Sequence, residues 1–283
     1  MIEIAKTFFG ISNGRTQGRG YASYRFTLGG VMSVSSRTLT GSRLLAALSG
    51  VHQERLRAEL DFIPLPLREV LYEPLETICY IYFPVDGVVS IVALMEDGLT
   101  AEVGLVGKEG MVGVPVLLGM TTTPNRAIVQ LEGSSLRMEA GAFRSYVTKH
   151  PSVERYFLRY AQLRLSQVSL IAACNGLHRI EQRLARWLLM VGDRMESDSF
   201  FLTQEYAATM LAVRRAGVTH AAGLLQKAGI INYVRGHVTI LDRPKLESIS
   251  CECYRAGKSY ARLAIYTAPV PESAGKLLTA VAP

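Results

Sequence analysis

The sequence predicts an α+β fold: an N-terminal β-roll (a double-stranded β-helix), a long helix and a C-terminal winged helix-turn-helix. Three observations predict this order. Short β-rich segments separated by turn residues fill residues 69–138, a helical pattern opens at Pro151, and residues 203–241 read helix, turn, helix and hairpin. A chain of 283 residues is long enough for one large or two ordinary domains, each with its own core.

Composition excludes several classes of protein. With 49% hydrophobic and 19% charged residues, the chain has the profile of neither a disordered nor a fibrous protein. Four cysteines are too few for a disulfide scaffold. The longest apolar runs, such as Met111 to Met120, fall short of the roughly 18 residues that span a bilayer. We therefore expect a soluble, cytoplasmic protein without membrane contact.

The net charge of +7 is unevenly distributed. Residues 1–45 carry a net +5 and residues 46–150 a net −5, whereas residues 203–245 hold six basic and two acidic side chains. A compact basic segment behind an acidic middle favours a module that meets a polyanion, although uneven charge is also ordinary in two-domain chains.

Residues 1–41 are rich in Gly, Ser, Thr and Arg and show no clear period. They lack the continuous apolar region of a secretory signal. We predict a disordered arm, or a start codon assigned too early with Met32 as the true one. An organellar transit peptide is the third alternative, because the segment is rich in Arg and Ser and poor in acids.

Residues 42–150 are predicted to form the roll. A short amphipathic helix is expected over 42–59, where leucines and valine recur at helical spacing. The strands that follow carry β-branched or aromatic residues and are divided by turn signals such as Asp86-Gly87 and Asp97-Gly98. The predicted strands are residues 69–72, 79–83, 88–94, 100–105, 127–130 and 135–138.

Residues 151–176 are predicted to form one long helix that mediates a homodimer. The stripe consists of Tyr156, Leu163, Leu170 and Leu177, seven residues apart, with Tyr160, Gln167 and Cys174 four residues after the first three. Such a stripe is typical of a seam with a partner helix, and the alternative is that it packs on the chain's own β domain. Asn175-Gly176 weakens the helix, which makes it the predicted hinge.

Residues 177–254 are predicted to form the winged helix-turn-helix, with a flexible tail over 255–283. Thr203 can cap a helix over 204–211, and Ala228-Gly229 can end a second helix that begins near Arg214. Two strands, 230–233 and 237–241, then flank Arg235-Gly236.

The second helix is the predicted recognition helix, with Val218, Leu224 and Leu225 facing the core. The candidate DNA-binding residues are Gln204, Arg214, Arg215, Gly217, Thr219, His220 and Arg235. In the major groove an arginine can bond guanine O6 and N7, while Gln204 and Arg235 are expected to hold phosphates. The alternative is a solvated face of an ordinary helical bundle.

Residues from about 44 to 254 resemble the CRP/FNR family of bacterial transcription regulators, most strongly over 202–241. The resemblance implies a cyclic-nucleotide-binding-type roll, a dimer helix, double-stranded DNA as target and RNA polymerase as partner. Arg215 matches the family's guanine-reading arginine. His220 replaces a second common arginine and Ala216 a common glutamate, which implies a different target sequence.

The effector site departs further from the family. Gly113 and the pair Arg126-Ala127 fit the frame of the phosphate-binding cassette, but Val114 replaces the glutamate that accepts the ribose hydroxyl. Arg126 can pair with a phosphate, or with an acidic side chain such as Glu102 or Glu109. The effector is therefore unknown and is not expected to be ordinary cyclic AMP; a constitutive regulator with a degenerate, ligand-free sensor is the alternative.

Other cofactors are weakly indicated. Iron–sulfur sensing of the FNR type needs cysteines near the N-terminus, and residues 1–78 contain none. Haem sensing stays an open alternative, because His52, His150 and His178 can each be a haem ligand or an ordinary surface or core histidine. Cys251 and Cys253 are too close-set and isolated for a metal site to be assigned, so zinc or redox chemistry stays a minor alternative.

An enzyme is the least favoured class. A metal-dependent barrel of the cupin kind needs histidine ligands inside the roll, and residues 53–149 contain none. No catalytic residue is assigned.

Overall fold

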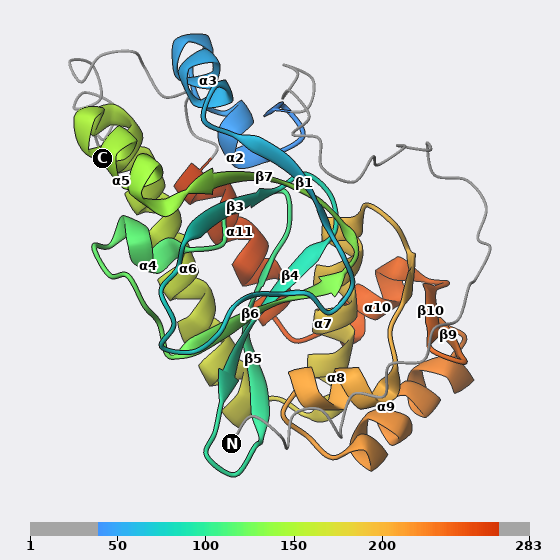
Figure 1. Ribbon diagram of the computed structural model, residues 1–283. Coiled ribbons are helices and arrows are strands. Elements are labelled where there is room, and N and C mark those ends of the chain that lie inside the picture. The colour runs from blue at the N-terminus through green and yellow to red at the C-terminus, as the bar shows by residue number, and fades with distance from the viewer. Residues whose placement is uncertain (1–38, 266–283) are drawn as a thin grey trace. The chain divides into compact units, whose positions relative to one another are not determined.

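The computed structural model describes residues 39–265, and its strands and helices follow one another as Figure 1 shows. All but the last three residues of the predicted leader, Met32 included, lie outside the described residues, and so do residues 266–283. Among the residues that are described, no helix has the length and apolar character needed to cross a bilayer.

Two short helices, α2 (Arg43–Ala46) and α3 (Gly50–Arg57), open the described chain. The sequence predicted one helix over 42–59. Ser49 has extended backbone (φ −63°, ψ 154°) and acts as the N-cap of α3, so the helical pattern is divided at this residue. Leu44 and Leu45 before the break and Leu56 after it are at most 2% exposed, which explains the apolar periodicity on both sides.

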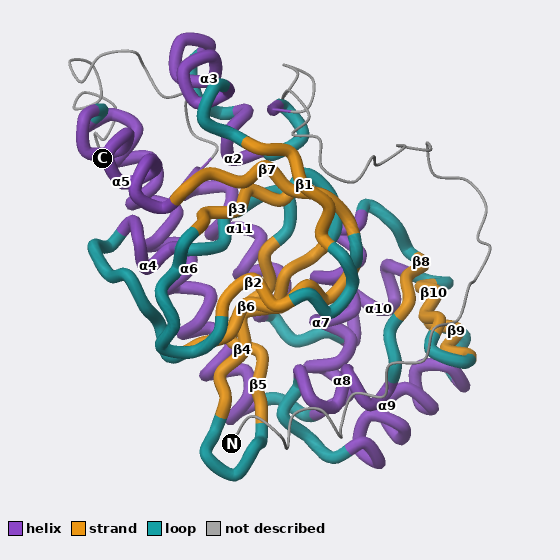
Figure 2. Tube along the Cα trace, in the orientation of Figure 1, coloured by secondary structure: helices purple, strands orange, loops and turns teal. Residues whose placement is uncertain are grey.

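The predicted β-roll is present as two antiparallel sheets, with strand orders β1-β7-β3 and β2-β6-β4-β5 (Figure 2). The strands are β1 (Asp61–Leu65), β2 (Val70–Tyr72), β3 (Tyr80–Pro84), β4 (Val88–Leu94), β5 (Thr100–Val106), β6 (Asn125–Leu131) and β7 (Gly133–Glu139). The sequence missed β1 because Pro64 argues against a strand; β1 lies at a sheet edge, where a missing N–H is tolerated.

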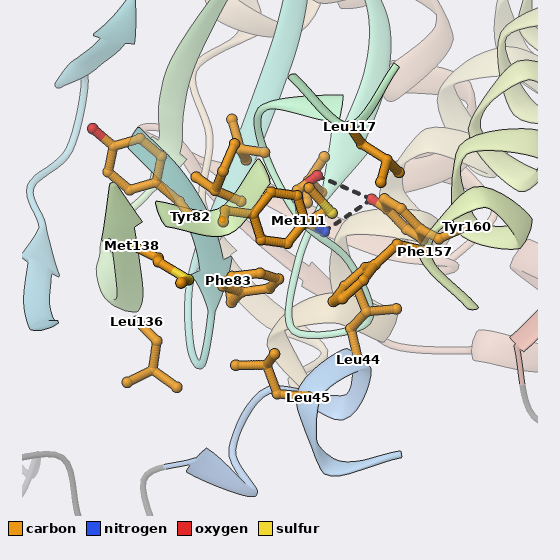
Figure 3. Packing of buried hydrophobic residues seen from close by; sticks show 14 of the residues in the cluster. Leu44, Leu45, Tyr82, Phe83, Met111, Leu117, Leu136, Met138, Phe157 and Tyr160 are labelled. Carbon is orange, nitrogen blue, oxygen red and sulfur yellow. Dashed lines mark hydrogen bonds between the residues drawn. The ribbon is translucent and has the colours of Figure 1, made fainter. Parts of the chain in front are cut away.

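Aromatic side chains pack together in the hydrophobic core of the roll (Figure 3). The rings of Phe83, Phe143 and Phe157 lie 5.2–6.1 Å apart, in tilted and edge-to-face arrangements that aromatic pairs prefer. The Tyr160 hydroxyl donates to the Met111 carbonyl (3.1 Å) and accepts from its amide (3.0 Å). Helices α4 (Val114–Leu117), α5 (Ala140–Lys149) and α6 (Pro151–Leu177) complete this half.

The predicted seam on α6 is buried largely within its own chain. Tyr156, Tyr160 and Leu163 belong to the core of the roll and are at most 4% exposed. Further along, helix α11 (Cys253–Ile265) packs against α6, with Leu170 beside Gly257. These residues therefore follow the alternative that the sequence left open, packing within the chain.

The break after α6 lies two residues later than the sequence indicated. The helix continues through the predicted hinge at Asn175-Gly176 and ends at Leu177. His178 (φ −107°, ψ 146°) and Arg179 (φ −67°, ψ 157°) have extended backbone, and Arg179 is the N-cap of the next helix. Glycine lowers helix propensity, but the i→i−4 ladder of a 27-residue helix is not interrupted by it here.

The remaining elements form the winged helix-turn-helix and its extension. They are α7 (Ile180–Met195), β8 (Ser199–Phe201), α8 (Gln204–Met210), α9 (Arg215–Lys227), β9 (Ile231–Val234), β10 (His237–Ile240), α10 (Arg243–Ile249) and α11. The three strands pair in the order β8-β10-β9. The sequence predicted a flexible tail from residue 255. In the structure α11 continues to Ile265 and Ala261 packs against the core, so these residues are helical.

Candidate nucleic-acid interface

Helices α8 and α9 are joined by a tight turn that the sequence encodes locally. The Thr203 hydroxyl accepts from the Tyr206 amide (3.1 Å) and caps α8, as predicted. Ala212 has a positive φ of 50°, which reverses the chain, and Arg214 is the N-cap of α9. Gly229 has a φ of 68° directly after the last helical turn, in the position that favours glycine.

One face of α9 anchors the helix in the core. Val218, Ala221 and Leu225 are at most 2% exposed and pack with Trp187 and other residues of α7. Leu224 was expected to join them but is 44% exposed. The stripe of α9 that faces the core is narrow, and alanines contribute to it where the sequence suggested a leucine.

The opposite face of α9 presents its polar side chains to solvent. Arg214, Arg215, Thr219 and His220 are all exposed. Arg215 is 68% exposed and its guanidinium lies 3.4 Å from the Glu205 carboxylate on α8. An exposed pair of this kind contributes at most about 1 kcal/mol, so a phosphate or a guanine can displace Glu205 readily.

Two of the predicted contacts have structural roles. Gln204 accepts a hydrogen bond from the Thr219 hydroxyl (2.7 Å), which joins the start of α8 to the first turns of α9. Gly217 faces α7: a Cβ at this position would lie 2.9 Å from Ile180 Cδ1. Glycine therefore permits the close approach of α9 to α7, since a side chain here would displace the end of Ile180; sequence reasoning did not detect this role.

The N-terminus of α9 is suited to an anion. Its first turn contains no acidic residue, and Arg214 makes no side-chain cap. The first amides of a 13-residue helix therefore point outward with the positive end of the helix dipole, beside two arginines. This arrangement can hold a phosphate at the same place where Arg215 is presented.

The wing is the β9–β10 hairpin, with Arg235 exposed at its tip. Arg235 (φ 49°) and Gly236 (φ 82°) both have left-handed backbone, as a two-residue type I′ turn requires. A Cβ on Gly236 would lie 2.8 Å from the Phe201 ring, so glycine is required for packing as well as for backbone geometry.

The predicted effector residues are built into the roll. Arg126 pairs with Glu73 (2.8 Å), and not with Glu102 or Glu109, because the pairing of β2 with β6 brings the end of β2 beside it. Ala127 is completely buried between Tyr72 and Ile91 on the neighbouring strands.

Gly113 has a structural role as well. It has a φ of 102°, and a Cβ there would lie 2.6 Å from Ile81 Cδ1. Val114, at the position of the family's glutamate, packs against the apolar core of the roll. Neither residue presents a polar side chain to a ligand.

A buried hydrogen bond joins the roll to α7. Glu102 on β5 is 6% exposed and accepts from the Trp187 indole N–H (2.8 Å). Around it, apolar residues of β4, β5 and β6 share one cluster with those of α7 to α9. The Ser90 hydroxyl lies 2.9 Å from Glu102 and 2.6 Å from Gln130 Oε1. The single hydroxyl hydrogen of Ser90 can be donated to only one of these two acceptors at a time.

This buried carboxyl predicts a pH dependence. Burial raises the pKa of Glu102 above its usual 4.5, outweighing its hydrogen bonds with Trp187 and Ser90. A carboxyl whose pKa is raised by folding stabilises the folded state when the pH is below the ordinary pKa of that carboxyl. This contribution to the unfolding free energy is lost as the pH rises through the raised pKa of the folded state. We expect Glu102→Gln to flatten the fall in unfolding free energy above pH 4.5, measured by urea unfolding.

Trp187 is the single tryptophan of the chain, so its fluorescence reports this site directly. Glu59→Gln, which alters an exposed carboxylate, is the matched control. Identical pH profiles for Glu102→Gln and the wild-type protein would contradict the assignment.

Two family models match this chain. Residues 63–150 match the cyclic nucleotide-binding domain. Residues 182–249 match the Crp-like helix-turn-helix domain. The first match covers the roll from β1 to α5, and the second covers α7 to α10. Together they span more than half of the chain. No curated protein matches.

Solved structures share the fold. FixK2 from Bradyrhizobium japonicum is 17% identical with a TM-score of 0.60, over 68% of this chain and 98% of that one. The c-di-GMP responsive global regulator CLP of Xanthomonas campestris is 17% identical with a TM-score of 0.55, over 68% and 99%. A CRP-family transcriptional regulator from Thermus thermophilus is 21% identical with a TM-score of 0.53, over 66% and 96%.

The order of the two matched domains agrees with the order of the elements in the structure, a β-roll, a long helix and a helix-turn-helix with a β-hairpin wing. The chain therefore belongs to the CRP/FNR family of transcription regulators, with a cyclic nucleotide-binding domain followed by a DNA-binding Crp-like helix-turn-helix domain.

Proposed function

We propose that this regulator binds a roughly palindromic DNA site as a homodimer, with α9 in the major groove. The observation that carries the proposal is the exposed face of α9, where two arginines and a free helix N-terminus lie together. Arg215 would read guanine, with Thr219 and His220 beside it on the same face. Arg214 and Arg235 would contact phosphates, and Gln204 would hold Thr219 in place.

A second stripe on α6 supports the homodimer. Leu158, Leu165 and Ala172 lie seven residues apart, with Val168 between the last two, and all four are exposed. Leu165 is 59% exposed. Heptad spacing of exposed apolar residues on a long helix fits a parallel partner helix from a second copy. We name these four residues the α6 stripe.

We propose that the sensor does not use ordinary cyclic AMP. Val114 has no acceptor for a ribose hydroxyl, and Glu73 already pairs with the one cassette arginine. Two readings remain: a different effector, or a constitutive regulator with a degenerate sensor. If there is a different effector, its binding would shift α6 against α7 at the His178 break and change the populations of two conformational states.

We also propose that RNA polymerase is a partner, as the family resemblance implies, and that the protein is cytoplasmic.

Calorimetry of the full chain against cyclic AMP tests the sensor. We expect no saturable heat, in a preparation that still binds DNA. The uncharged variant Glu73→Gln, which frees Arg126, serves as the comparison. Saturable binding of cyclic AMP by the wild-type chain would contradict this part of the proposal.

Selection of bound duplexes from a random pool tests the DNA-binding proposal. We expect an enriched site with two inverted half-sites about 34 Å apart, one helical turn of DNA. Enrichment of a single half-site would contradict the dimer, and failure to enrich any sequence would contradict specific recognition.

A further inference from the structure

Four side chains with metal-binding atoms converge where α6, α7 and α11 meet. Cys174 lies in the last turn of α6, and His178 is its C-cap. Cys251 and Cys253 flank the start of α11, 77 and 79 residues further along the chain than Cys174. Their ligand atoms all lie within 4.8 Å of one another. We name this group the Cys₃His cluster.

The distances suit one tetrahedral ion. Cys174 Sγ and Cys251 Sγ are 3.5 Å apart, and Cys253 Sγ is 3.6 Å from His178 Nδ1. With Zn–S bonds of about 2.3 Å, tetrahedral geometry places two sulfur ligands roughly 3.8 Å apart. The ligands of a multi-iron cluster attach to different iron atoms and stand further apart, so the spacing favours a single ion.

The backbone explains how Cys251 and Cys253 reach the same point. Ser250 is extended (φ −61°, ψ 150°) and ends α10, while α11 begins at Cys253. Cys251 therefore lies in the connection and Cys253 on the first helical turn. Cys174 and His178 are four residues apart at the end of α6, which places both side chains over the same turn.

His178 has the outer partner that metal-binding histidines usually have. Its Nε2 lies 3.2 Å from the Glu252 carboxylate, and its Nδ1 faces Cys253. A carboxylate on the far ring nitrogen fixes the tautomer, turns the ring and strengthens the imidazole as a ligand. Glu252 thus stands in the position of a carboxylate–histidine–metal triad.

Two buried arginines interact electrostatically with the cluster. Arg183 and Arg186 are at most 7% exposed. Arg183 donates to the Leu211 carbonyl and Arg186 to the Met190 sulfur, and no carboxylate pairs with either within the described residues. A Zn²⁺ ion with three thiolates and one neutral imidazole carries one net negative charge, which complements these buried cations.

We propose that Cys174, His178, Cys251 and Cys253 bind one zinc ion that fixes α11 to the junction of α6 and α7. All four positions are filled by protein ligands, as in structural zinc sites. Because His178 is one of the two non-helical residues between α6 and α7, zinc would restrict the same break at which the sensor half connects to the DNA-binding half.

Metal analysis of the purified full chain is the primary test. We expect about one zinc ion per chain, retained after dialysis against a weak chelator. Cys253→Ser should lose it, whereas the matched control Cys79→Ser, which alters an exposed cysteine outside the cluster, should retain it. Absence of zinc from the wild-type chain, together with no uptake on titration with zinc chloride, would overturn the proposal. Equal loss in the control would also overturn it.

Glu252→Gln provides a test that does not depend on a core substitution, because Glu252 is 72% exposed. We expect this variant to fold and to bind zinc about tenfold more weakly in competition with a chromophoric chelator. Unchanged affinity would contradict the triad. Substitution with cobalt should give thiolate-to-metal charge-transfer absorption that Cys253→Ser reduces and Cys79→Ser leaves intact.

Two other occupants of the cluster are distinguished by the same samples. Mass spectrometry after alkylation without reductant would reveal a Cys174–Cys251 disulfide, and its presence as the main species would overturn the zinc proposal. Iron in place of zinc, with visible absorption in the purified chain, would do the same. Because metal content is measured without DNA, failure of this proposal is distinguishable from failure of DNA recognition.

Discussion

Replacing Arg215 with alanine is expected to lower affinity for the selected DNA site by roughly tenfold to a hundredfold for each half-site, with loss of base preference. The guanidinium is exposed on the first turn of α9 and pairs with the exposed Glu205 carboxylate. A bidentate contact with guanine discriminates by about 1–3 kcal/mol, and alanine cannot replace it. Competition binding with the selected site and single-base variants measures both effects.

Two further variants separate base reading from charge. Arg57→Ala removes an arginine on α3 that is paired with Glu54, so it changes net charge equally and should leave binding unchanged. Arg235→Ala at the wing should weaken binding to all DNA sequences alike. It should also lower the slope of log affinity against log salt concentration by about one. Retention of base preference by Arg215→Ala would refute the role given to that residue.

Leu165→Arg is expected to convert the dimer to a monomer and to weaken binding to the two-half-site duplex by about 10²- to 10⁴-fold. Leu165 is central in the α6 stripe, and a charge there would be buried without a partner in the seam. The loss is large because each half-site must then be bound separately. Sedimentation velocity measures the oligomeric state, and binding to a single half-site should change little.

Leu99→Arg is the matched control, since Leu99 is 68% exposed in the connection between β4 and β5. It should remain dimeric. A wild-type chain that sediments as a monomer, or a Leu165→Arg variant that stays dimeric, would show that the α6 stripe is not the seam.

The elements of the DNA-binding half could be predicted because their signals are local. Thr203 caps α8, Gly229 ends α9 and Arg235-Gly236 forms the hairpin turn, each within a few residues of the element it defines. Side-chain hydrogen bonding and left-handed backbone act over these short separations. The exposed positions of Arg214, Arg215 and His220 follow from the same helical period.

The stripe on α6 shows where periodicity is insufficient. Tyr156 and Leu163 repeat as Leu158 and Leu165 do, yet the first pair is buried in the roll and the second is exposed. A seven-residue repeat indicates that a helix face is covered but does not identify what covers it. Only the folded chain separates the intramolecular face from the face left for a partner.

The features that the sequence did not predict are contacts between residues far apart in the chain. Arg126 meets Glu73, 53 residues earlier, and Trp187 meets Glu102, 85 residues earlier. The Cys251–Cys253 pair indicated a metal site only as a minor alternative, because the other two side chains of the cluster lie on α6 and at its end. No spacing rule links such positions, since the packing of α11 on α6 brings them together.

Recognition of DNA sequence is assigned here to the exposed face of α9. Fluorescence anisotropy of the full chain with the selected duplex, and with a scrambled duplex of the same composition at physiological salt, tests it most directly. We expect at least about 10³-fold tighter binding to the selected duplex. Equal affinity for the two duplexes, with the same salt dependence, would contradict it.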